Sequence, residues 1–337
     1  MSAPQGGSIH AAIGYSTTRK LIGDAPAIRN EPGTKIQTSL RCAPQPKRQA
    51  EGGLRLRHQF KAGGFFDDGA AQSPPLISFV TVVYNGAAQL EKTVLSVLGQ
   101  TYDNVEYIVI DGGSTDGTLA ILRKYDQAID YWVSEPDLGI SDAFNKGLAV
   151  ATGQFVGFIN ADDWYECNAA QLVVAAAIQH QADIIHGQLR YWSGKVAAEL
   201  FSADHDLLER DMTINHPTVI ARLGLYRSVG GFNADFRYAM DYEWLRRSKV
   251  SGARFFYLAA PLANMSLGGI SDVRWKRAIR EVARVKLIYS PDKITPWISY
   301  GLQLSRGVAR RLLERMGLTW IVRFYHTRIS LVSKSFK

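Results

Sequence analysis

The sequence predicts an α/β fold in which helices cover both faces of a mostly parallel sheet. Apolar runs of strand length alternate with segments of helical spacing from about residue 75 to residue 165. Strands that are covered on both faces are expected to consist almost entirely of apolar residues, and these runs have that composition. The chain has 337 residues, of which 46% are hydrophobic, so it can bury a sizeable core. Nucleotide binding is a common use of this architecture, but the function has to be argued from the residues of a site.

Each predicted strand ends in a polar segment, and a helix follows. Strands are predicted at 76–84, 105–110, 130–134 and 155–159, and helices at about 90–98, 119–125 and 141–151. The dipeptide Pro74-Pro75 marks the start of the folded part. The strand at 155–159 is the most informative one, because it ends in the adjacent carboxylates Asp162 and Asp163.

Polar side chains stand at the carboxyl ends of three predicted strands. Tyr84, Asp111 and Asp162 are expected to converge on one cleft, because ligands of open α/β sheets bind outside the carboxyl ends of the strands. Carboxylate oxygens there suit a divalent cation held against a diphosphate. The alternative for this pair is that Asp163 caps the following helix.

The Gly-rich loop at 111–118 also stands between a strand and a helix. Its glycines, Gly112, Gly113 and Gly117, allow backbone N–H groups to approach a phosphate or a base closely. The loop matches neither the dinucleotide-binding pattern nor the P-loop pattern. Taken alone, it is equally compatible with a turn in which Asp116 caps the next helix.

Charge divides the chain into three parts. Residues 1–72 carry 10 basic and 5 acidic residues, residues 73–272 carry 14 and 23, and residues 273–337 carry 15 and 3. The acidic middle argues against a nucleic-acid-binding groove and suits a metal site, whereas a basic end suits an anionic surface. Residues 1–73 lack a sustained apolar period and are predicted to be a disordered basic arm.

The segment 273–337 is predicted to be a basic helical tail. Apolar residues recur every three or four positions between Trp297 and Leu313, with arginines between them. Such a helix suits the surface of an anionic membrane, although a helix packed on the folded domain has the same pattern. No run of 18 or more apolar residues is present, so a soluble or peripheral protein is expected. The two cysteines, Cys42 and Cys167, indicate no disulfide framework and leave a cytoplasmic setting as the default.

Seven motifs then carry a family resemblance. They are VVYN at 82–85, DGGSTDGT at 111–118, EPDLGISDAFNKG at 135–147, NADDW at 160–164, HPT at 216–218, GGF at 230–232 and MDYEWLRR at 240–247. In this order they resemble the family 2 glycosyltransferases, inverting enzymes of the GT-A fold, over about residues 74–272. The similarity is greatest to bacterial enzymes that build exopolysaccharide, O-antigen or colanic-acid-type polymers.

The resemblance implies roles for individual residues. Tyr84 and Asp111 correspond to residues that hold the base of the nucleotide sugar, and Gly112 stands where many relatives have a second Asp. Asp162 corresponds to the residue near the ribose or donor sugar. Asp163 corresponds to the ligand of Mn²⁺ or Mg²⁺, and the pair together forms the expected metal site. A bound cation neutralises the charge that develops on a leaving nucleoside diphosphate.

Asp241 corresponds to the catalytic base of the family. Inversion needs a carboxylate within hydrogen-bond reach of the acceptor hydroxyl, on the opposite side of the anomeric carbon from the leaving group. Without the resemblance, Asp241 is better explained as a surface carboxylate at the start of a helix. Glu243 is the rival base, but two positions along a helix its side chain points elsewhere.

The remaining motifs carry weaker implications. His216 is expected to be a packing residue or to lie near the acceptor. Gly268–Ser271 resembles a loop that closes over the diphosphate in relatives. Arg274-Trp275 resembles a motif of processive synthases, but Ser271 stands where those enzymes have Gln, so processive polymerisation is not expected.

These observations predict an inverting, metal-dependent glycosyltransferase. The expected donor is a nucleotide sugar, with a UDP-sugar favoured, and the expected acceptor is a saccharide, either growing or linked to polyprenyl diphosphate. An anionic membrane surface, the cytoplasmic face of the inner membrane, is the expected location, and nucleic acid is not an expected partner. The alternative is a non-catalytic nucleotide-binding scaffold protein on the same fold. The choice of sugar is expected to lie in the segment 186–211, where Tyr191 and Trp192 either stack on a sugar or pack in the core.

Overall fold

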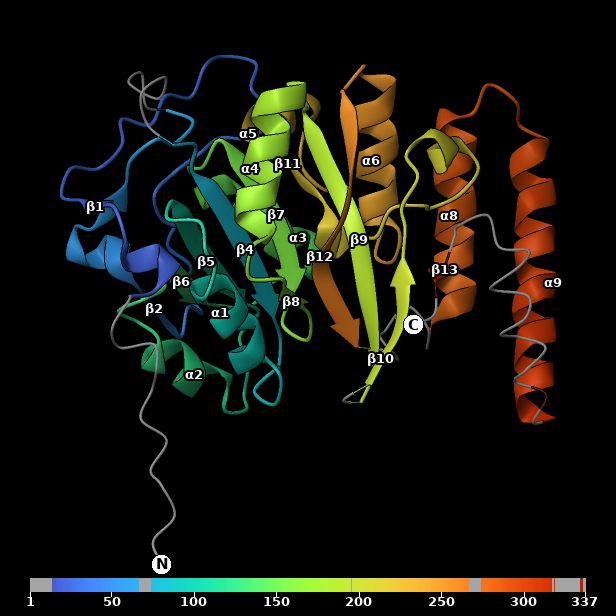
Figure 1. The fold of residues 1–337 in the computed structure, drawn as a ribbon, viewed down its shortest axis with the longest axis horizontal. Coiled ribbons are helices and arrows are strands. Elements are labelled where there is room, and N and C mark those ends of the chain that lie inside the picture. The colour runs from blue at the N-terminus through green and yellow to red at the C-terminus, as the bar shows by residue number, and fades with distance from the viewer. Residues whose placement is uncertain are drawn as a thin grey trace, which may run out of the picture.

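The computed structural model of the chain describes residues 14–66, 74–194, 196–266, 274–316, 318 and 334–335. Over these residues, one sheet of eleven strands runs through the molecule, and helices lie against it (Figure 1). Its strands are β2 (Ala50–Gly52), β4 (Ile77–Val83), β5 (Val105–Asp111), β6 (Tyr131–Ser134), β7 (Phe155–Asn160), β8 (Trp164–Tyr165), β9 (Ile184–Ser193), β10 (Val196–Phe201), β11 (Ile220–Arg222), β12 (Phe255–Ser266) and β13 (Lys334–Ser335). A separate pair consists of β1 (Leu21–Ile22) and β3 (Phe60–Lys61).

The helices of the described residues fall between the strands. They are α1 (Leu90–Leu98), α2 (Thr118–Lys124), α3 (Ile140–Val150), α4 (Ala169–His180), α5 (Leu223–Val229), α6 (Met240–Val250), α8 (Trp275–Tyr289) and α9 (Thr295–Arg315). Short 3-10 turns are η2 (Ser16–Thr18), η3 (Leu54–Arg57), η5 (Asp206–Glu209) and η6 (His216–Thr218). The predicted helices at 90–98, 119–125 and 141–151 correspond to α1, α2 and α3.

Four neighbouring strands at the centre of the sheet run parallel in the order β7, β4, β5 and β6. Val82 lies beside Asn160, Val83 beside Asp111, and Asp111 beside Ser134. The carboxyl ends of these strands therefore meet along one line, called here the carboxyl edge. This placement is what a sheet of right-handed β-α-β units produces, because each helix returns the chain to the opposite edge.

Alternate residues of the central strands enter two different cores, one on each face. Val80 and Ile108 pack with Phe144 of α3, whereas Phe79 and Val109 belong to the core that contains α1 and α4. Strands enclosed in this way have no polar face, which explains the continuous apolar runs in the sequence. The predicted α/β class, with helices covering both faces of a central sheet, is confirmed. The four central strands are parallel as predicted, but most of the strand pairs around them are antiparallel, so the whole sheet is mixed.

The N-terminal segment differs from its prediction. Residues 14–66, called here the N-terminal strap, form η2, β1, β2, η3 and β3 and pack on the domain, so the prediction of a disordered arm is wrong for them. In β2, the strap adds an antiparallel strand beside β6. Leu54 and Phe60 are 3% and 7% exposed, and the buried Arg55 lies 2.5 Å from Glu106 of β5. A few anchor residues and a buried ion pair thus hold a segment whose average composition is too polar to predict order. Residues 1–13 and 67–73 lie outside the described part.

The C-terminal segment is helical over 275–289 and 295–315, as expected from its spacing. Helix α8 is attached to the catalytic domain. Its Glu281 accepts hydrogen bonds from the backbone N–H groups of Tyr238 (2.6 Å) and Ala239 (3.0 Å), and its Val285 is fully buried. Helix α9 lies against α8 at the margin of the molecule (Figure 1). The loop Gly268–Ser271 lies outside the described residues.

Among the helices of the described residues, none combines the length and the apolar character that a bilayer crossing requires.

Candidate active site

The carboxyl edge brings together side chains from three successive strand ends. Asp111 is the last residue of β5 and lies between Val83 of β4 and Ser134 of β6. Tyr84, the residue after β4, is 66% exposed although it adjoins a fully buried strand. Asp162 follows β7 in an exposed turn. The predicted meeting of Tyr84, Asp111 and Asp162 at one edge therefore agrees with the strand registers.

Asp111 is fully buried, and its carboxylate is saturated by neighbouring donors. The hydroxyl of Ser134 donates to Oδ2 at 2.5 Å, and the backbone N–H of Ser114 donates to the same oxygen at 3.1 Å. The Ser114 hydroxyl also donates to Oδ1. These bonds tie the Gly-rich turn to the ends of β5 and β6, so Asp111 fixes the shape of the turn.

The glycines of this turn allow neighbouring side chains to approach it closely. At Gly113, φ is +82°, a value that favours glycine. A Cβ on Gly112 would lie 2.4 Å from Oδ2 of Asp137 and 3.5 Å from Cδ2 of Tyr84. The missing side chain thus leaves room for the Asp137 carboxylate, with the ring of Tyr84 close by. Asp137 belongs to the EPDLGISDAFNKG motif in the loop between β6 and α3, and the fold brings it to this turn.

The two carboxylates after β7 differ sharply in exposure. Asp162 is exposed, whereas Asp163 is fully buried, and neither of its side-chain oxygens has a hydrogen-bond partner among the described residues. Oδ1 of Asn160 is similarly buried and unpartnered. Burial, with the charge of Asp162 adding to it, raises the pKa of Asp163 well above its usual range. An unpaired buried carboxylate is costly, so this group of oxygens fits a cation.

The turn that carries this pair is held from α1. The Thr93 hydroxyl lies 2.9 Å from the carbonyl oxygen of Ala161 and 2.6 Å from that of Asp163. No cluster of three or more His, Cys, Asp or Glu side chains occurs in the described part of the chain. The protein therefore offers a partial set of ligands, which a diphosphate and water would have to complete.

Asp241 lies in the first turn of α6, and the start of that helix is located at the carboxyl edge. Met240 Sδ is 2.8 Å from the hydroxyl of Ser141, which belongs to the first turn of α3 directly after β6. Asp241 is partly exposed. Desolvation of its carboxyl group by the surrounding protein raises the pKa to about 6, and the negative charge of Glu281 makes a smaller contribution in the same direction. A half-buried carboxylate with a pKa near neutrality is well suited to accept a proton.

Comparison with known proteins identifies the family. Residues 78–219 match the family described as Glycosyl transferase family 2. An uncharacterized glycosyltransferase of Mycobacterium tuberculosis is 31% identical over 189 residues, which cover 53% of this chain and 70% of that protein. The chain belongs to glycosyltransferase family 2.

Further relatives of this glycosyltransferase agree in family and fold. A PGL/p-HBAD biosynthesis glycosyltransferase of Mycobacterium bovis is 29% identical, covering 59% of this chain and 80% of that protein. Staphylococcus aureus TarS 1–349, solved in complex with UDP-GlcNAc, has a TM-score of 0.53 at 17% identity and covers 76% of each chain. A mannosyltransferase from Pyrobaculum calidifontis, solved with GDP-Man and Mn²⁺, has a TM-score of 0.53 at 18% identity, covering 74% and 81%. The predicted GT-A fold is thereby confirmed.

Glu243, the alternative candidate for the catalytic base, makes structural contacts. Glu243 is 3% exposed, pairs with Arg247 at 2.9 Å and accepts a 2.5 Å hydrogen bond from the Tyr289 hydroxyl. The pair with Arg247 lies within α6, and the hydrogen bond from Tyr289 joins α6 to α8. Asp241 accepts a bond of 2.8 Å from the backbone N–H of Tyr242, and it is the less constrained carboxylate of the two.

His216 occupies the core beside the site. Its ring stacks on Phe144 with centroids 5.1 Å apart and lies 6.1 Å from Phe158 of β7. Burial lowers the pKa of the imidazole to about 4, so this ring is neutral at physiological pH. The packing role, one of the two that the sequence left open, is the one the contacts support.

Aromatic rings from the predicted specificity segment lie near the carboxylate pair. Trp192 and Trp164 have ring centroids 5.7 Å apart, and the indole N–H of Trp192 donates to Oδ1 of Asn264 at 2.8 Å. The Tyr191 hydroxyl donates to Oδ1 of Asn215 at 3.1 Å. Trp164 and Trp192 are both partly exposed. The Lys92 ammonium lies over the Trp164 ring, 2.8 Å from its centroid, so Trp192 offers the better ring surface for stacking on a sugar.

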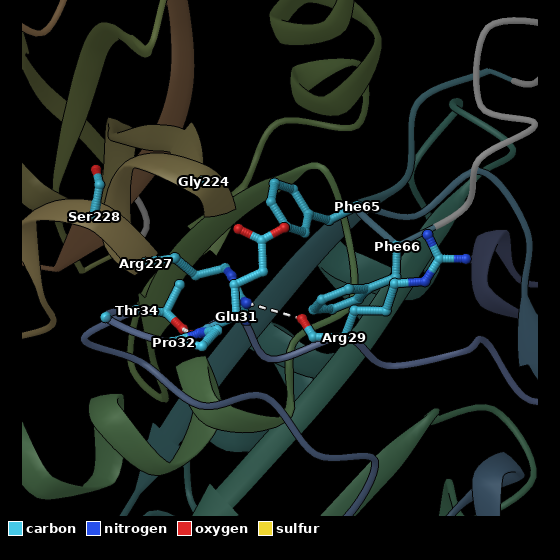
Figure 2. A pocket seen from close by; sticks show the side chains of 10 residues that line it. Arg29, Glu31, Pro32, Thr34, Phe65, Phe66, Gly224, Arg227 and Ser228 are labelled. Atoms are coloured by element: carbon cyan, nitrogen blue, oxygen red, sulfur yellow. Dashed lines mark hydrogen bonds between the residues drawn. The ribbon is translucent and has the colours of Figure 1, made fainter.

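A cavity of about 600 Å³ lies elsewhere, between the N-terminal strap and α5 (Figure 2). Phe65, which lines it, donates its backbone N–H to Thr152 just before β7, at the amino ends of the central strands. The guanidinium of Arg227 in its wall bonds to Oγ1 of Thr38 at 2.9 Å and to Oδ1 of Asn30 at 3.1 Å. This cavity therefore lies at the opposite edge of the sheet from the candidate site.

Proposed function

We propose that this glycosyltransferase moves a sugar from a nucleotide sugar, with UDP as the favoured carrier, to a saccharide acceptor with inversion of configuration. The observation that carries the proposal is the placement of Asp241. It is a half-buried carboxylate, with a pKa of about 6, at the same edge as the exposed Asp162 and the exposed Tyr84. This arrangement provides separate groups for the leaving side and for the accepting side of one reaction.

The donor would bind across the carboxyl edge. The exposed ring of Tyr84 offers a stacking surface for a base, and Gly112 leaves the neighbouring backbone accessible. Asp162 and Asp163 would hold Mn²⁺ or Mg²⁺, with Asp162 the ligand that a diphosphate can reach and Asp163 behind it. Such a cation supplies stabilisation of the negative charge on the departing nucleoside diphosphate.

Asp241 would act as the base that accepts the proton of the acceptor hydroxyl. The carboxylate takes the proton of the acceptor hydroxyl while that oxygen forms its bond to the anomeric carbon, and the bond to the nucleoside diphosphate breaks on the opposite face. A base with a pKa of about 6 is mostly ionised at neutral pH and still accepts a proton readily. Its position in the first turn of α6 favours the ionised form through the helix dipole.

The acceptor is proposed to be a growing or polyprenyl-diphosphate-linked saccharide at the cytoplasmic face of a bacterial membrane. Support comes from α9, whose exposed apolar side chains recur at spacings that place them on one side of the helix. Those on or next to α9 are 43–70% exposed and comprise Ile294, Trp297, Ile298, Leu302, Val308, Leu312 and Met316. The other side packs on the protein, for example through Ser299 and Lys286 at 2.9 Å. A basic helix with such a face suits the headgroup region of an anionic membrane.

A nucleotide-release assay tests the function. Purified protein is incubated with a panel of UDP- and GDP-sugars, lipid-linked saccharide acceptors and Mn²⁺, and the released nucleoside diphosphate is measured with and without a chelator. We expect acceptor-dependent release from one donor, lost on chelation. Asp241→Asn should abolish release and keep nucleotide binding, whereas Asp235→Asn, an exposed carboxylate in the preceding loop, should change neither.

Two outcomes would contradict the proposal. Normal turnover by Asp241→Asn would remove the assigned base. Nucleotide binding without release from any sugar, in the presence of every acceptor offered, would favour the scaffold alternative.

A further inference from the structure

We propose that the N-terminal strap supplies part of the wall of the nucleotide site, and that the side-chain amide of Gln49 recognises the hydrogen-bonding edge of the donor's base. The inference rests on the proposed function, because it requires a nucleotide at the carboxyl edge. It assigns a role in donor selection to a segment that precedes the matched family region, which begins at residue 78.

The strap enters the sheet beside the candidate site. Ala50 of β2 pairs with Ser134 of β6, and the backbone N–H of Gln49 donates to the Ser134 carbonyl oxygen at 2.8 Å. Because β2 is antiparallel to β6, Gln49 lies at the carboxyl end of β6. Asp111 is the neighbour of Ser134 on the other side. One strand, β6, therefore separates Gln49 from the end of β5.

The side chain of Gln49 borders the Gly-rich turn. Its Oε1 lies 3.4 Å from the Ser134 hydroxyl, which donates its hydrogen to Oδ2 of Asp111 at 2.5 Å. Its Nε2 lies 3.6 Å from the position that a Cβ on Gly113 would take. Gln49 is an exposed residue, so its amide is accessible to a ligand that rests on the turn.

The chemistry of this wall suits a nucleobase. Asp111 is fully buried and engaged with Ser114 and Ser134, which leaves the Gln49 amide among the groups that a ligand can reach there. A carboxamide carries both a donor and an acceptor, and nucleobase edges present both. Tyr84 offers the exposed ring beside the same turn. Stacking on the ring and one or two hydrogen bonds to the amide would together select a base.

Arg48 holds Gln49 in place. The Arg48 Nε donates to Oε2 of the buried Glu135 at 2.8 Å, and Lys146 of α3 lies 3.1 Å from the other oxygen of Glu135. Glu135 in turn donates its backbone N–H to the Asp111 carbonyl oxygen at 3.0 Å. The strap, the loop after β6 and the end of β5 are thereby joined into one unit. A side chain on such a unit is positioned by the fold and does not depend on a mobile arm.

Equilibrium binding tests the inference. Dissociation constants for UDP, GDP and inorganic pyrophosphate are measured with Mg²⁺ for the full chain and for Gln49→Ala. We expect the variant to bind the preferred nucleoside diphosphate about three- to tenfold more weakly, the value of one or two neutral hydrogen bonds, with pyrophosphate affinity unchanged. Gln49→Glu, which replaces the amide donor by an acceptor, should alter the ratio of UDP to GDP affinity.

Gln59→Ala is the matched control, because Gln59 is an exposed glutamine of the same strap beside Leu54, at the amino end of β6. It should leave all three constants unchanged, and thermal unfolding should show that each variant is folded. If Gln49→Ala weakens the binding of pyrophosphate as much as that of the nucleotide, or if both Gln49 variants bind nucleotide normally, the role of Gln49 is wrong while the proposed function still stands. A wild-type protein that binds neither nucleoside diphosphate more tightly than pyrophosphate would overturn the proposed donor as well.

Discussion

The pKa of Asp241 leads to a quantitative expectation for the pH dependence of transfer. Burial raises this pKa from 3.8 to about 6, and the carboxylate has to be ionised to accept the acceptor proton. The ionised fraction, and with it the rate, should therefore rise with pH and reach half of its plateau near pH 6. At about pH 5 the rate should be roughly a tenth of the plateau, whereas an ordinary Asp would still retain more than about nine-tenths.

The assay is kcat/KM for the acceptor between about pH 4.5 and 8, measured at saturating donor and metal so that donor binding does not contribute. Glu281→Gln should move the midpoint to lower pH, because removal of the neighbouring negative charge makes the Asp241 carboxylate easier to ionise. A rate that stays flat down to about pH 5, with donor binding intact, would refute the assignment of Asp241 as the base.

The same pKa has a consequence for stability. The folded-state pKa of Asp241 is raised, so the folded protein loses stability as pH rises from the ordinary value toward about 6. Asp241→Asn keeps the shape of the side chain and removes this penalty. Thermal unfolding at neutral pH should therefore show a variant that is at least as stable as the wild type, which separates a lost base from a lost fold.

Three further expectations follow from other contacts. Asp163→Asn should abolish metal-dependent donor binding measured by calorimetry, and Asp162→Asn should weaken it. Asp163→Asn should also raise the thermal midpoint without metal, because it removes an unpartnered buried carboxylate; a fall in that midpoint would contradict this. Arg55→Met should lower the free energy of unfolding at neutral pH by about 3–5 kcal/mol, because it leaves Glu106 buried without its cation. The control Arg57→Met removes a more exposed arginine and should cost about 0–1 kcal/mol. Equal losses for the two variants in urea titrations would contradict a buried Arg55–Glu106 pair. Full-length protein should co-sediment with anionic but not neutral vesicles, less so at high salt, and binding to neither would remove the membrane role of α9.

Sequence and structure agree most closely where the signal is local. The central strands and helices follow from apolar runs and helical spacing, because strands enclosed on both faces are predominantly apolar. The order of the strand ends then places Tyr84, Asp111 and Asp162 at one edge. The N-terminal strap shows where this reasoning fails. Its order depends on a few distant contacts, such as Arg55 with Glu106, which average composition does not reveal.

The candidate site divides in the same way. The sequence alone determined the α/β class, the carboxylates after the strand at 155–159 and the family resemblance, since each is encoded in a short, continuous stretch of residues. Only the tertiary structure decided that Asp163 is enclosed while Asp162 is exposed, that Glu243 is engaged by Arg247, and that Gln49 borders the Gly-rich turn. Exposure, pKa and proximity depend on which distant segments pack around a residue, and no local pattern in the chain specifies that packing.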